Sequence, residues 1–261
     1  MAAARRQIAH RPLLDLTFAS DADAAAFAGL SLAPRHVRVD SSSVAELPGF
    51  SEGGWWVQDL SASLPARLIP AKAKRVLDLC AAPGGKTMQL AAAGHAVIAV
   101  DSAKSRLERL RENLHRTQLK AELVEADALK WKPQGDVDAI LLDAPCSATG
   151  TFRRHPEVLY RARPRIISEG AELQRRLLDR AAQWLKPGGT LVYSVCSLEP
   201  EEGEEVIGAF LAGHPDFAIE TGELPDFVTS SPEGWVRSLP GLLEAEGGLD
   251  GFFMARLVRS R

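Results

Sequence analysis

The feature that most constrains the fold is an alternation of short apolar runs with longer helical patterns from about Arg75 onward. The apolar runs are RVLDLC (75–80), AVIAVD (96–101), AELVEAD (121–127), AILLDAP (139–145) and TLVYSVC (190–196). Helical patterns lie between several of them, in residues 84–94, 102–117 and 167–185, and KPGG (186–189) ends the last one. Strands that alternate with helices are typical of βαβ units. The alternation predicts an α/β chain with a doubly wound, mostly parallel sheet.

Two segments flank this pattern. At the C-terminal end, DGFFMARLVR (250–259) predicts a last strand that pairs antiparallel at an edge of the sheet. The first 70 residues instead show one helical stretch (20–30), one possible strand (36–40) and Pro-rich turns. We therefore expect two domains: a small N-terminal α/β subdomain over residues 1–70, which contacts RNA, and a larger domain over residues 71–261.

Composition narrows the class of protein. With 261 residues and 46% hydrophobic content, the chain can bury a large core. No apolar run reaches the roughly 18 residues that a membrane span needs, and residues 1–16 lack the pattern of a secretory signal. Three cysteines without CxxC spacing form neither a disulfide framework nor a zinc motif. We expect a cytoplasmic protein that has no metal ion and does not contact a membrane.

The net charge of −3 hides a segregation of charge along the chain. Residues 151–165 (TFRRHPEVLYRARPR) hold five arginines and one acid, whereas residues 199–205 (EPEEGEE) hold five acids and no base. A basic run alone is usually only a solvated face. Because this run directly follows DAPCSATG (143–150), a candidate site discussed below, we expect it to bind RNA phosphates. The residues expected to do so are Arg153, Arg154, His155 and Arg161.

The segment VLDLCAAPGGKT (76–87) runs a buried strand into a turn of small residues and then into a helix. Backbone N–H groups at residues 82–86 can approach a ligand closely in such a turn. The turn lacks the GxGxxG and GxxxxGK[ST] spacings, which argues against hydride transfer and phosphoryl transfer. The segment predicts a nucleoside-type site.

Acidic residues close the second, third and fourth strands of the predicted sheet, at Asp101, Asp127 and Asp143. An acid at the end of the second strand bonds ribose hydroxyls in doubly wound nucleoside sites. Taken alone, Asp101 or Asp127 fits a helix N-cap equally well. Three carboxylates at one sheet edge beside a Gly-rich turn favour a ligand with a ribose, an adenine amine and a cationic centre. S-adenosylmethionine is such a ligand.

Two of the three cysteines, Cys146 and Cys196, lie at the carboxyl ends of strands, where open α/β sheets place their sites. Packing is the default interpretation of a free cysteine, and Cys80 fits it by its position in a strand. If the fourth and fifth strands are neighbours, their ends lie roughly 5 Å apart and both thiols face one pocket. A thiolate that adds to C6 of a pyrimidine turns the ring into an enamine whose C5 attacks a sulfonium methyl. Asp143 would stabilise the charge that develops on the ring.

Four segments resemble successive motifs of the RsmB/NOP (Sun- or Fmu-like) family of RNA cytosine-C5 methyltransferases. They are LDLCAAPGGKT (77–87), VDSAKSRLERLRENLHR (100–116), LLDAPCSATGTFRRHPE (141–157) and YSVCSLEPEEGEEVI (193–207). GWWVQDLSASLPARLI (54–69) resembles the segment that leads into them, and the resemblance covers about residues 53–258. The chain departs from the family pattern at Val195 and Gly203, where threonine and asparagine are common. The resemblance implies a seven-stranded Rossmann-like methyltransferase sheet.

By this resemblance, the chain uses S-adenosylmethionine to form 5-methylcytidine in RNA, with ribosomal RNA of the 16S type as the expected substrate. Cys196 is then the nucleophile that forms a covalent adduct with C6, and Cys146 assists release of the methylated RNA. Lys86 lies at the mouth of the site, with Asp143 beside the base. The implied cofactor-binding residues are Cys80, Ala81, Ala82, Pro83, Gly84, Gly85, Lys86, Asp101, Arg106, Asp127 and Asp143. We expect a monomer.

Two rival functions stay open at the level of sequence. A DNA cytosine-C5 methyltransferase attacks with the cysteine of a Pro-Cys pair, which would make Cys146 the nucleophile; the chain has no long second domain for DNA recognition. A non-catalytic RNA-binding or ribosome-assembly factor would keep the fold without the catalytic residues. The chain retains those residues, which argues against this alternative: Cys146, Cys196, Asp143 and Lys86. Bacterial members of the family often carry a further helical RNA-binding domain, so the chain is either a catalytic fragment or a naturally short member.

Overall fold

The structure is a computed structural model that describes Ile8, residues 11–41 and residues 43–261. The expectation about a secretory signal in residues 1–16 falls largely on residues 1–7 and 9–10, which lie outside these ranges. Within the described ranges, no helix combines the length and the apolar character that crossing a membrane requires.

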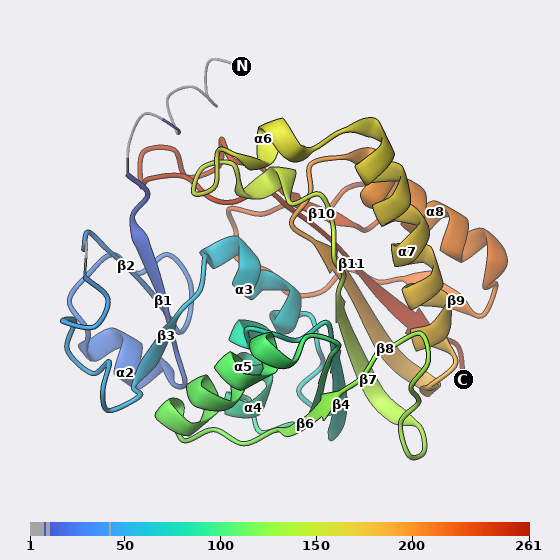
Figure 1. The fold of residues 1–261 in the computed structure, drawn as a ribbon, viewed down its shortest axis with the longest axis horizontal. Coiled ribbons are helices and arrows are strands. Elements are labelled where there is room, and N and C mark those ends of the chain that lie inside the picture. Colours follow the sequence, from blue (N-terminus) through green and yellow to red (C-terminus); the bar gives the residue numbers. More distant parts are fainter. Residues whose placement is uncertain (1–7, 9–10, 42) are drawn as a thin grey trace.

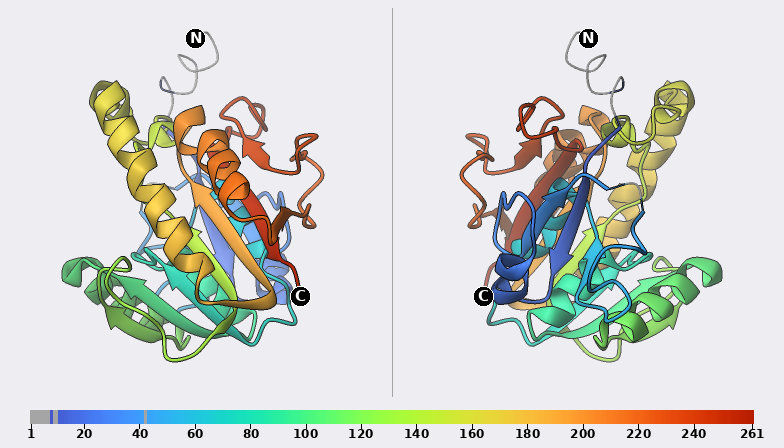
Figure 2. Two further views of the ribbon diagram at one scale, coloured as in Figure 1. Left: turned by 90° about the vertical axis from the view of Figure 1, so that its right-hand side faces the viewer. Right: turned by 90° about the vertical axis from the view of Figure 1, so that its left-hand side faces the viewer.

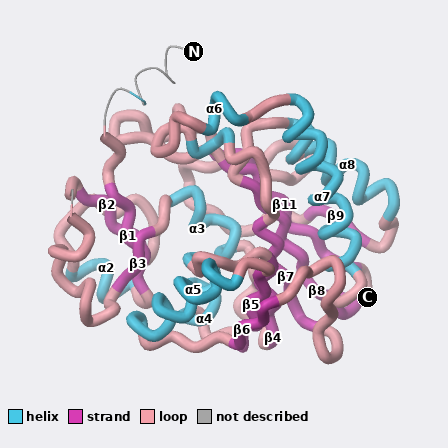
Figure 3. Tube along the Cα trace, viewed as in Figure 1, coloured by secondary structure: helices cyan, strands magenta, loops and turns pink. Residues whose placement is uncertain are grey.

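An eight-stranded sheet organises the described chain (Figures 1 and 3). Its order is β10-β11-β8-β7-β4-β5-β6, and β9 pairs with β11 beside this path. The strands from β8 to β6 are parallel to their neighbours, whereas β11 is antiparallel to β8. The bounds are β4 (Arg75–Leu79), β5 (Ala96–Asp101), β6 (Glu122–Glu125), β7 (Val137–Asp143), β8 (Leu185–Val195), β9 (Phe217–Ile219), β10 (Val236–Ser238) and β11 (Phe252–Arg259). The predicted mostly parallel sheet is confirmed.

The large sheet has eight strands where the sequence predicts seven. β9 and β10 contain three residues each and pair antiparallel with opposite ends of β11. A three-residue strand is too short to show an alternating pattern, so only its pairing with a distant segment defines it. β11 is antiparallel as predicted, but it lies one strand in from the edge because β9 and β10 cover its outer side.

The sequence predicts that KPGG (186–189) precedes the fifth strand. In the structure these residues lie inside that strand, β8, which already pairs with β7 at Leu185. The pairing shifts register before Thr190, and Gly188 adopts a left-handed backbone with φ 74° in the stretch between. The predicted end of the helix at KPGG is also wrong: α7 ends at Ala182, and the bulge lets β8 continue through residues 186–189.

Helices cover both faces of the large sheet, as a doubly wound fold requires. The bounds are α3 (Leu60–Arg67), α4 (Gly85–Ala92), α5 (Lys104–Thr117), α6 (Val158–Arg161), α7 (Pro164–Ala182) and α8 (Glu204–Gly213), with short 3-10 helices η1 (Thr149–Thr151) and η2 (Pro200–Glu202). Leu178 of α7 and Phe210 of α8 pack on one face, and Leu64 of α3 and Leu90 of α4 pack on the other. Figure 2 shows α7 on one side of the sheet and the N-terminal strands on the other.

A separate three-stranded antiparallel sheet lies near the N-terminus, in the order β2-β1-β3. Its elements are β1 (Leu14–Phe18), β2 (His36–Val39) and β3 (Trp55–Val57), with α2 (Asp21–Ala26) beside them. Helix α2 is shorter than the predicted 20–30, because the backbone of Phe27 is already extended. Helix α3 precedes residue 70 but packs against α4, β8 and β11 of the large sheet. The predicted domain boundary at residue 70 stays a prediction.

Candidate active site

The turn between β4 and α4 is built as the small residues predict. Cys80 and Gly84 have left-handed backbones, with φ 60° and φ 107°. A Cβ at residue 84 would lie 2.1 Å from Cδ1 of Leu110, so only glycine fits there. The backbone N–H of Ala82 donates to Oδ2 of Asp101 at 3.2 Å. The turn and the acid at the end of β5 therefore form one site.

A pocket of about 270 Å³ opens where β4, β5, β7 and β8 end; we call it the two-cysteine pocket. Apolar side chains of α7 line it together with polar groups from the strand ends. The predicted site residues that line it are Cys80, Ala82, Asp101, Arg106, Asp127, Asp143, Cys146 and Cys196. The structure thus brings the three strand-end acids and both candidate catalytic cysteines to one cavity.

The rest of the predicted loop lines a second pocket, of about 250 Å³, which we call the Lys86 pocket. Ala81, Ala82, Pro83, Gly84, Gly85 and Lys86 line it, together with Asp143 and with Gln58, Asp59, Asp78 and Arg154. Ala82 and Asp143 line both pockets. The residues predicted to bind one cofactor are therefore divided between two adjoining cavities.

Asp143 is held from two sides at this junction. Its Oδ2 accepts from Nζ of Lys86 at 2.8 Å, and its Oδ1 accepts from Oγ of Ser194 at 2.8 Å. Lys86 is largely buried, and its ammonium group lies 5.1 Å from the centre of the Phe252 ring. The pair of Lys86 and Asp143 presents a fixed cation and a fixed carboxylate side by side.

Neither Asp101 nor Asp127 is a helix N-cap, because Ala103 holds that position for α5 and no helix of the described chain begins directly after Asp127. Each Oδ1 accepts a backbone N–H two residues further on, from Ala103 and Leu129, at 2.9 Å. The buried Asp101 also accepts from Nη2 of Arg106 at 2.8 Å. The N-cap interpretation is therefore wrong for both residues, and both carboxylates line the two-cysteine pocket.

Cys146 and Cys196 lie with their sulfur atoms 3.5 Å apart. β7 and β8 are neighbours, as predicted, and the N–H of Gly150 donates to the carbonyl of Cys196 at 3.0 Å. The hydrogen bond with Cys196, and then burial, raise the pKa of the Cys146 thiol well above its usual value. Burial and the charges of Asp101 and Asp143 raise the pKa of the Cys80 thiol to about 12.

The sequence reasoning missed Glu202 as a residue of this site. Its carboxylate is fully buried and accepts from the backbone N–H of Ser147 at 2.9 Å and from its Oγ at 2.5 Å. Nε2 of Gln174 donates to the same carboxylate at 3.1 Å. Glu202 thereby fixes the loop that carries Cys146. The signal was present as two adjacent glutamates shortly after Cys196, although a run of acids indicates solvent exposure by default.

The two departures from the family motif are buried. A Cβ at Gly203 would lie 2.9 Å from Cγ of Phe253, so the aromatic ring excludes a larger residue. Val195 is fully buried and pairs with Phe253 across β8 and β11. Both departures concern packing around Phe253, and neither removes a reacting group.

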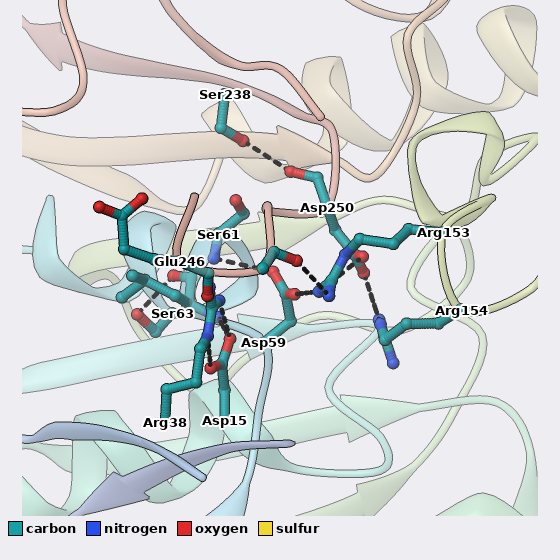
Figure 4. A network of polar contacts seen from close by, with 12 residues as sticks. Asp15, Arg38, Asp59, Ser61, Ser63, Arg153, Arg154, Ser238, Glu246 and Asp250 are labelled. Atoms are coloured by element: carbon teal, nitrogen blue, oxygen red, sulfur yellow. Dashed lines mark hydrogen bonds and ion pairs between the residues drawn. The ribbon is translucent and has the colours of Figure 1, made fainter. Parts of the chain in front are cut away.

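The four predicted RNA-binding residues fall into two groups. Arg153 and Arg154 join a buried network in which Arg153 lies between Asp59 and Asp250 (Figure 4). The side chain of Arg153 is only 2% exposed, so its predicted role as a direct phosphate ligand is corrected: its guanidinium neutralises buried carboxylates. Arg154 also pairs with Asp250, but it is partly exposed and lines the Lys86 pocket. His155 and Arg161 are exposed.

The fold and the site define a doubly wound methyltransferase domain with paired thiols at the carboxyl edge of its sheet. The sequence profile described as 16S rRNA methyltransferase RsmB/F matches residues 65–258, and the chain belongs to this family. Members of the family are S-adenosylmethionine-dependent methyltransferases.

Individual relatives agree with this membership. The chain is 46% identical over 224 residues to the ribosomal RNA small subunit methyltransferase B of Klebsiella pneumoniae, a match that covers 84% of this chain and 50% of the relative. The structure of a methyltransferase homolog protein from Pyrococcus horikoshii matches with a TM-score of 0.79 and 28% identity, over 98% of this chain and 90% of that one. The structure of NSun6 from the same organism, solved with SFG, matches with a TM-score of 0.74 and 31% identity. The match covers 87% of this chain and 58% of that one. The chain spans about half the length of the curated relatives it matches.

Proposed function

We propose that the chain methylates C5 of a cytidine in small-subunit ribosomal RNA, with S-adenosylmethionine as the methyl donor and a covalent adduct between Cys196 and C6. The observation that carries this proposal is the 3.5 Å separation of the Cys146 and Cys196 sulfur atoms in a pocket shared with three strand-end acids. Membership of the RsmB/F family supports the choice of ribosomal RNA. The proposal includes a monomer that acts in the cytoplasm without a metal ion.

The two-cysteine pocket has the groups that a nucleoside cofactor needs. Asp101 and Asp127 can accept hydrogen bonds from ribose hydroxyls and an adenine amine. Ala128 and Leu177 give the same pocket an apolar wall for a flat base. Asp143, at the other end, favours the positive charge of a sulfonium. S-adenosylmethionine supplies the methyl group as an electrophile; the remaining chemistry belongs to the chain.

The proposed reaction begins when the thiolate of Cys196 forms a bond to C6 of cytosine. The electron pair of the C5–C6 double bond is then available at C5, which bonds to the methyl carbon while the bond from that carbon to the sulfonium breaks and its electron pair stays on the departing sulfur. The ion pair of Lys86 and Asp143 lies where it can stabilise charge at N3 and the exocyclic amine. Loss of the C5 proton to solvent water restores the double bond, and the electron pair of the C6–S bond leaves with the sulfur of Cys196 as a thiolate. Cys146 assists this release.

The choice of Cys196 as nucleophile over the DNA-enzyme type of mechanism rests on the family resemblance, because the 3.5 Å contact is symmetric and either sulfur can be its donor. The hydrogen bond with Cys196 and burial raise the pKa of the Cys146 thiol well above its usual value. An S–H of Cys146 that donates toward Cys196 would stabilise a thiolate there, which is compatible with the proposed roles.

Single replacements of the cysteines test the proposal. Each variant is incubated with unmodified 16S ribosomal RNA and cofactor, and products are separated on a denaturing gel. Cys196→Ala should give neither methylation nor adduct, because no C6 bond forms. Cys146→Ala should accumulate a protein–RNA species that survives denaturation, because release is slow. Cys80→Ala removes a third thiol from the pocket and controls for thiol loss: it should retain methylation and accumulate no adduct. An adduct from Cys196→Ala and none from Cys146→Ala would reverse the assignment.

A further inference from the structure

The basic run of residues 151–165 divides into two parts, which we call the root and the tip. The root consists of Arg153 and Arg154, whose guanidinium groups pair with carboxylates of Asp59 and Asp250. Both acids are buried, and Arg153 also donates to the carbonyl of Gly247 at 3.3 Å. These contacts come from segments far away in the sequence and hold the root rigidly. The tip, residues 155–163, extends from this anchored base and includes α6.

The tip carries an unusually exposed aromatic side chain, Tyr160. It is 84% exposed, which is the highest value among the large hydrophobic residues exposed in the described part of the chain. Its neighbour Leu159 is 48% exposed, and Ile166 at the start of α7 is 46% exposed. The side chain of Tyr160 makes no hydrogen bond or ring contact within the described residues. An exposed apolar patch of this kind marks an interaction site more often than a scattered surface residue does.

The charges beside Tyr160 are positive and largely unopposed. Arg161 and Arg163 are exposed, and neither has a carboxylate partner within the described ranges. Arg165 pairs with Glu169 at 2.8 Å, and the tip's acid, Glu157, faces His155 at 3.4 Å. The two free guanidinium groups therefore flank an exposed aromatic ring. This combination fits a partner that has both flat bases and phosphates.

The tip lies on the side of the molecule where the candidate site opens. The chain passes directly from Asp143 and Cys146 through η1 and the root into α6. Figure 1 shows α6 and the beginning of α7 beyond the ends of β7 and β8, and both views of Figure 2 agree. A polynucleotide that places one base at the two thiols can therefore reach the tip with neighbouring nucleotides.

We propose that the tip binds unpaired RNA, with a base near the target cytidine stacked on Tyr160 and with phosphates held by Arg161 and Arg163. The inference rests on the proposed function for its RNA substrate and adds a residue that recognises that substrate. An aromatic platform accepts any base, because every base has a flat face, so Tyr160 contributes affinity rather than sequence choice. The arginines make the binding dependent on salt.

Steady-state methylation of unmodified 16S ribosomal RNA tests the proposal, alongside anisotropy measurements with a fluorescent single-stranded oligoribonucleotide. Tyr160→Ala should raise KM and Kd for RNA about ten-fold, because one stacked base is lost, and should leave kcat within two-fold. Tyr160→Phe should behave as the unmodified protein, because the ring remains. Arg161→Gln with Arg163→Gln should lower the slope of log Kd against log salt by up to about two.

Matched controls separate the tip from general surface effects. Leu239→Ala removes an apolar side chain that is 49% exposed elsewhere, and Arg109→Gln removes an exposed charge on α5; both should leave KM and Kd unchanged. Wild-type KM and Kd in Tyr160→Ala would overturn the proposal, as would an effect of this variant on self-association alone by sedimentation. If the unmodified protein transfers no methyl group to RNA, the proposed function fails, and the anisotropy measurement still decides the role of the tip.

Discussion

The root and the tip belong to one continuous basic run, yet the fold gives them opposite environments. At the root, Arg153 is buried between Asp59 and Asp250, and Nη2 of Arg153 lies 2.6 Å from Oδ2 of Asp59. At the tip, Arg161 and Arg163 are exposed beside Tyr160. Arg153 and its partner Asp59 are 94 residues apart in the sequence. The comparison teaches that an arginine's role depends on which carboxylates the fold brings to it, and these are invisible in the local sequence.

The acidic run at 199–205 divides in the same way. Glu202 is fully buried and holds the Cys146 loop, whereas Glu204 pairs with Arg237 at 2.6 Å near the surface. Other acids of the run, such as Glu201, are exposed. In both runs, residues of the same charge are divided between internal pairs and the solvent-exposed surface.

The largest expected effect separates the root from the tip by stability. Arg153→Met should lower the free energy of unfolding by about 3–5 kcal/mol, because Asp59 would stay buried without its cation and Asp250 would keep only Arg154. Arg161→Met should change it by less than about 0.5 kcal/mol, because that side chain is exposed. Urea unfolding of the two variants measures the difference. Equal, small effects would mean that the root is as dispensable as the tip.

A smaller effect concerns Asp78, a fully buried acid in β4 that has no arginine beside it. Burial raises its pKa to about 7; the hydrogen bond from Thr87 opposes the shift, and the charge of Asp143 adds to it. The folded state therefore keeps a proton that the unfolded chain loses near pH 3.9. Because the folded state binds more protons between these two pKa values, this group's contribution to stability falls as the pH rises from about 4 to about 7 and then levels off.

The asparagine in the Asp78→Asn variant cannot ionise. The free energy of unfolding of this variant, relative to that of the unmodified protein, should therefore rise by about 3 kcal/mol between pH 5 and pH 8. Urea unfolding of both proteins at the two pH values gives this difference, and the titration of other groups largely cancels between them. A difference that does not vary with pH would show that Asp78 is ionised in the folded protein.

The smallest expected effect tests whether charge or neutral hydrogen bonding holds the root. Oγ of the buried Ser238 donates to the carbonyl of Asp250 at 3.1 Å, within the network of Figure 4. Ser238→Ala should cost about 1 kcal/mol of unfolding free energy, the usual contribution of one neutral hydrogen bond. Its comparison with Arg153→Met in the same urea series ranks the two contributions. A cost as large as that of Arg153→Met would contradict the dominance of the ion pairs.

Much of the site could be predicted because its parts are local in sequence. The turn of residues 80–86 and the acids that follow β5, β6 and β7 lie at positions fixed by the βα rhythm. Parallel strands end at one edge, so those positions converge without further information. The division of the loop between two pockets escaped prediction, because it depends on Lys86 turning toward Asp143 and on Gln58 and Asp59 arriving from another segment.

By itself, the sequence determined the strand–helix alternation, the position of each cysteine relative to a strand end and membership of a family. These follow from periodicity and short motifs, which depend on neighbours along the chain. Only the tertiary structure decided that Arg153 is buried, that Glu202 accepts hydrogen bonds from the loop that carries Cys146, and that the two sulfur atoms lie 3.5 Å apart. The physical reason is that burial, pairing of charges and the approach of two thiols depend on contacts between segments distant in sequence, which no local pattern specifies.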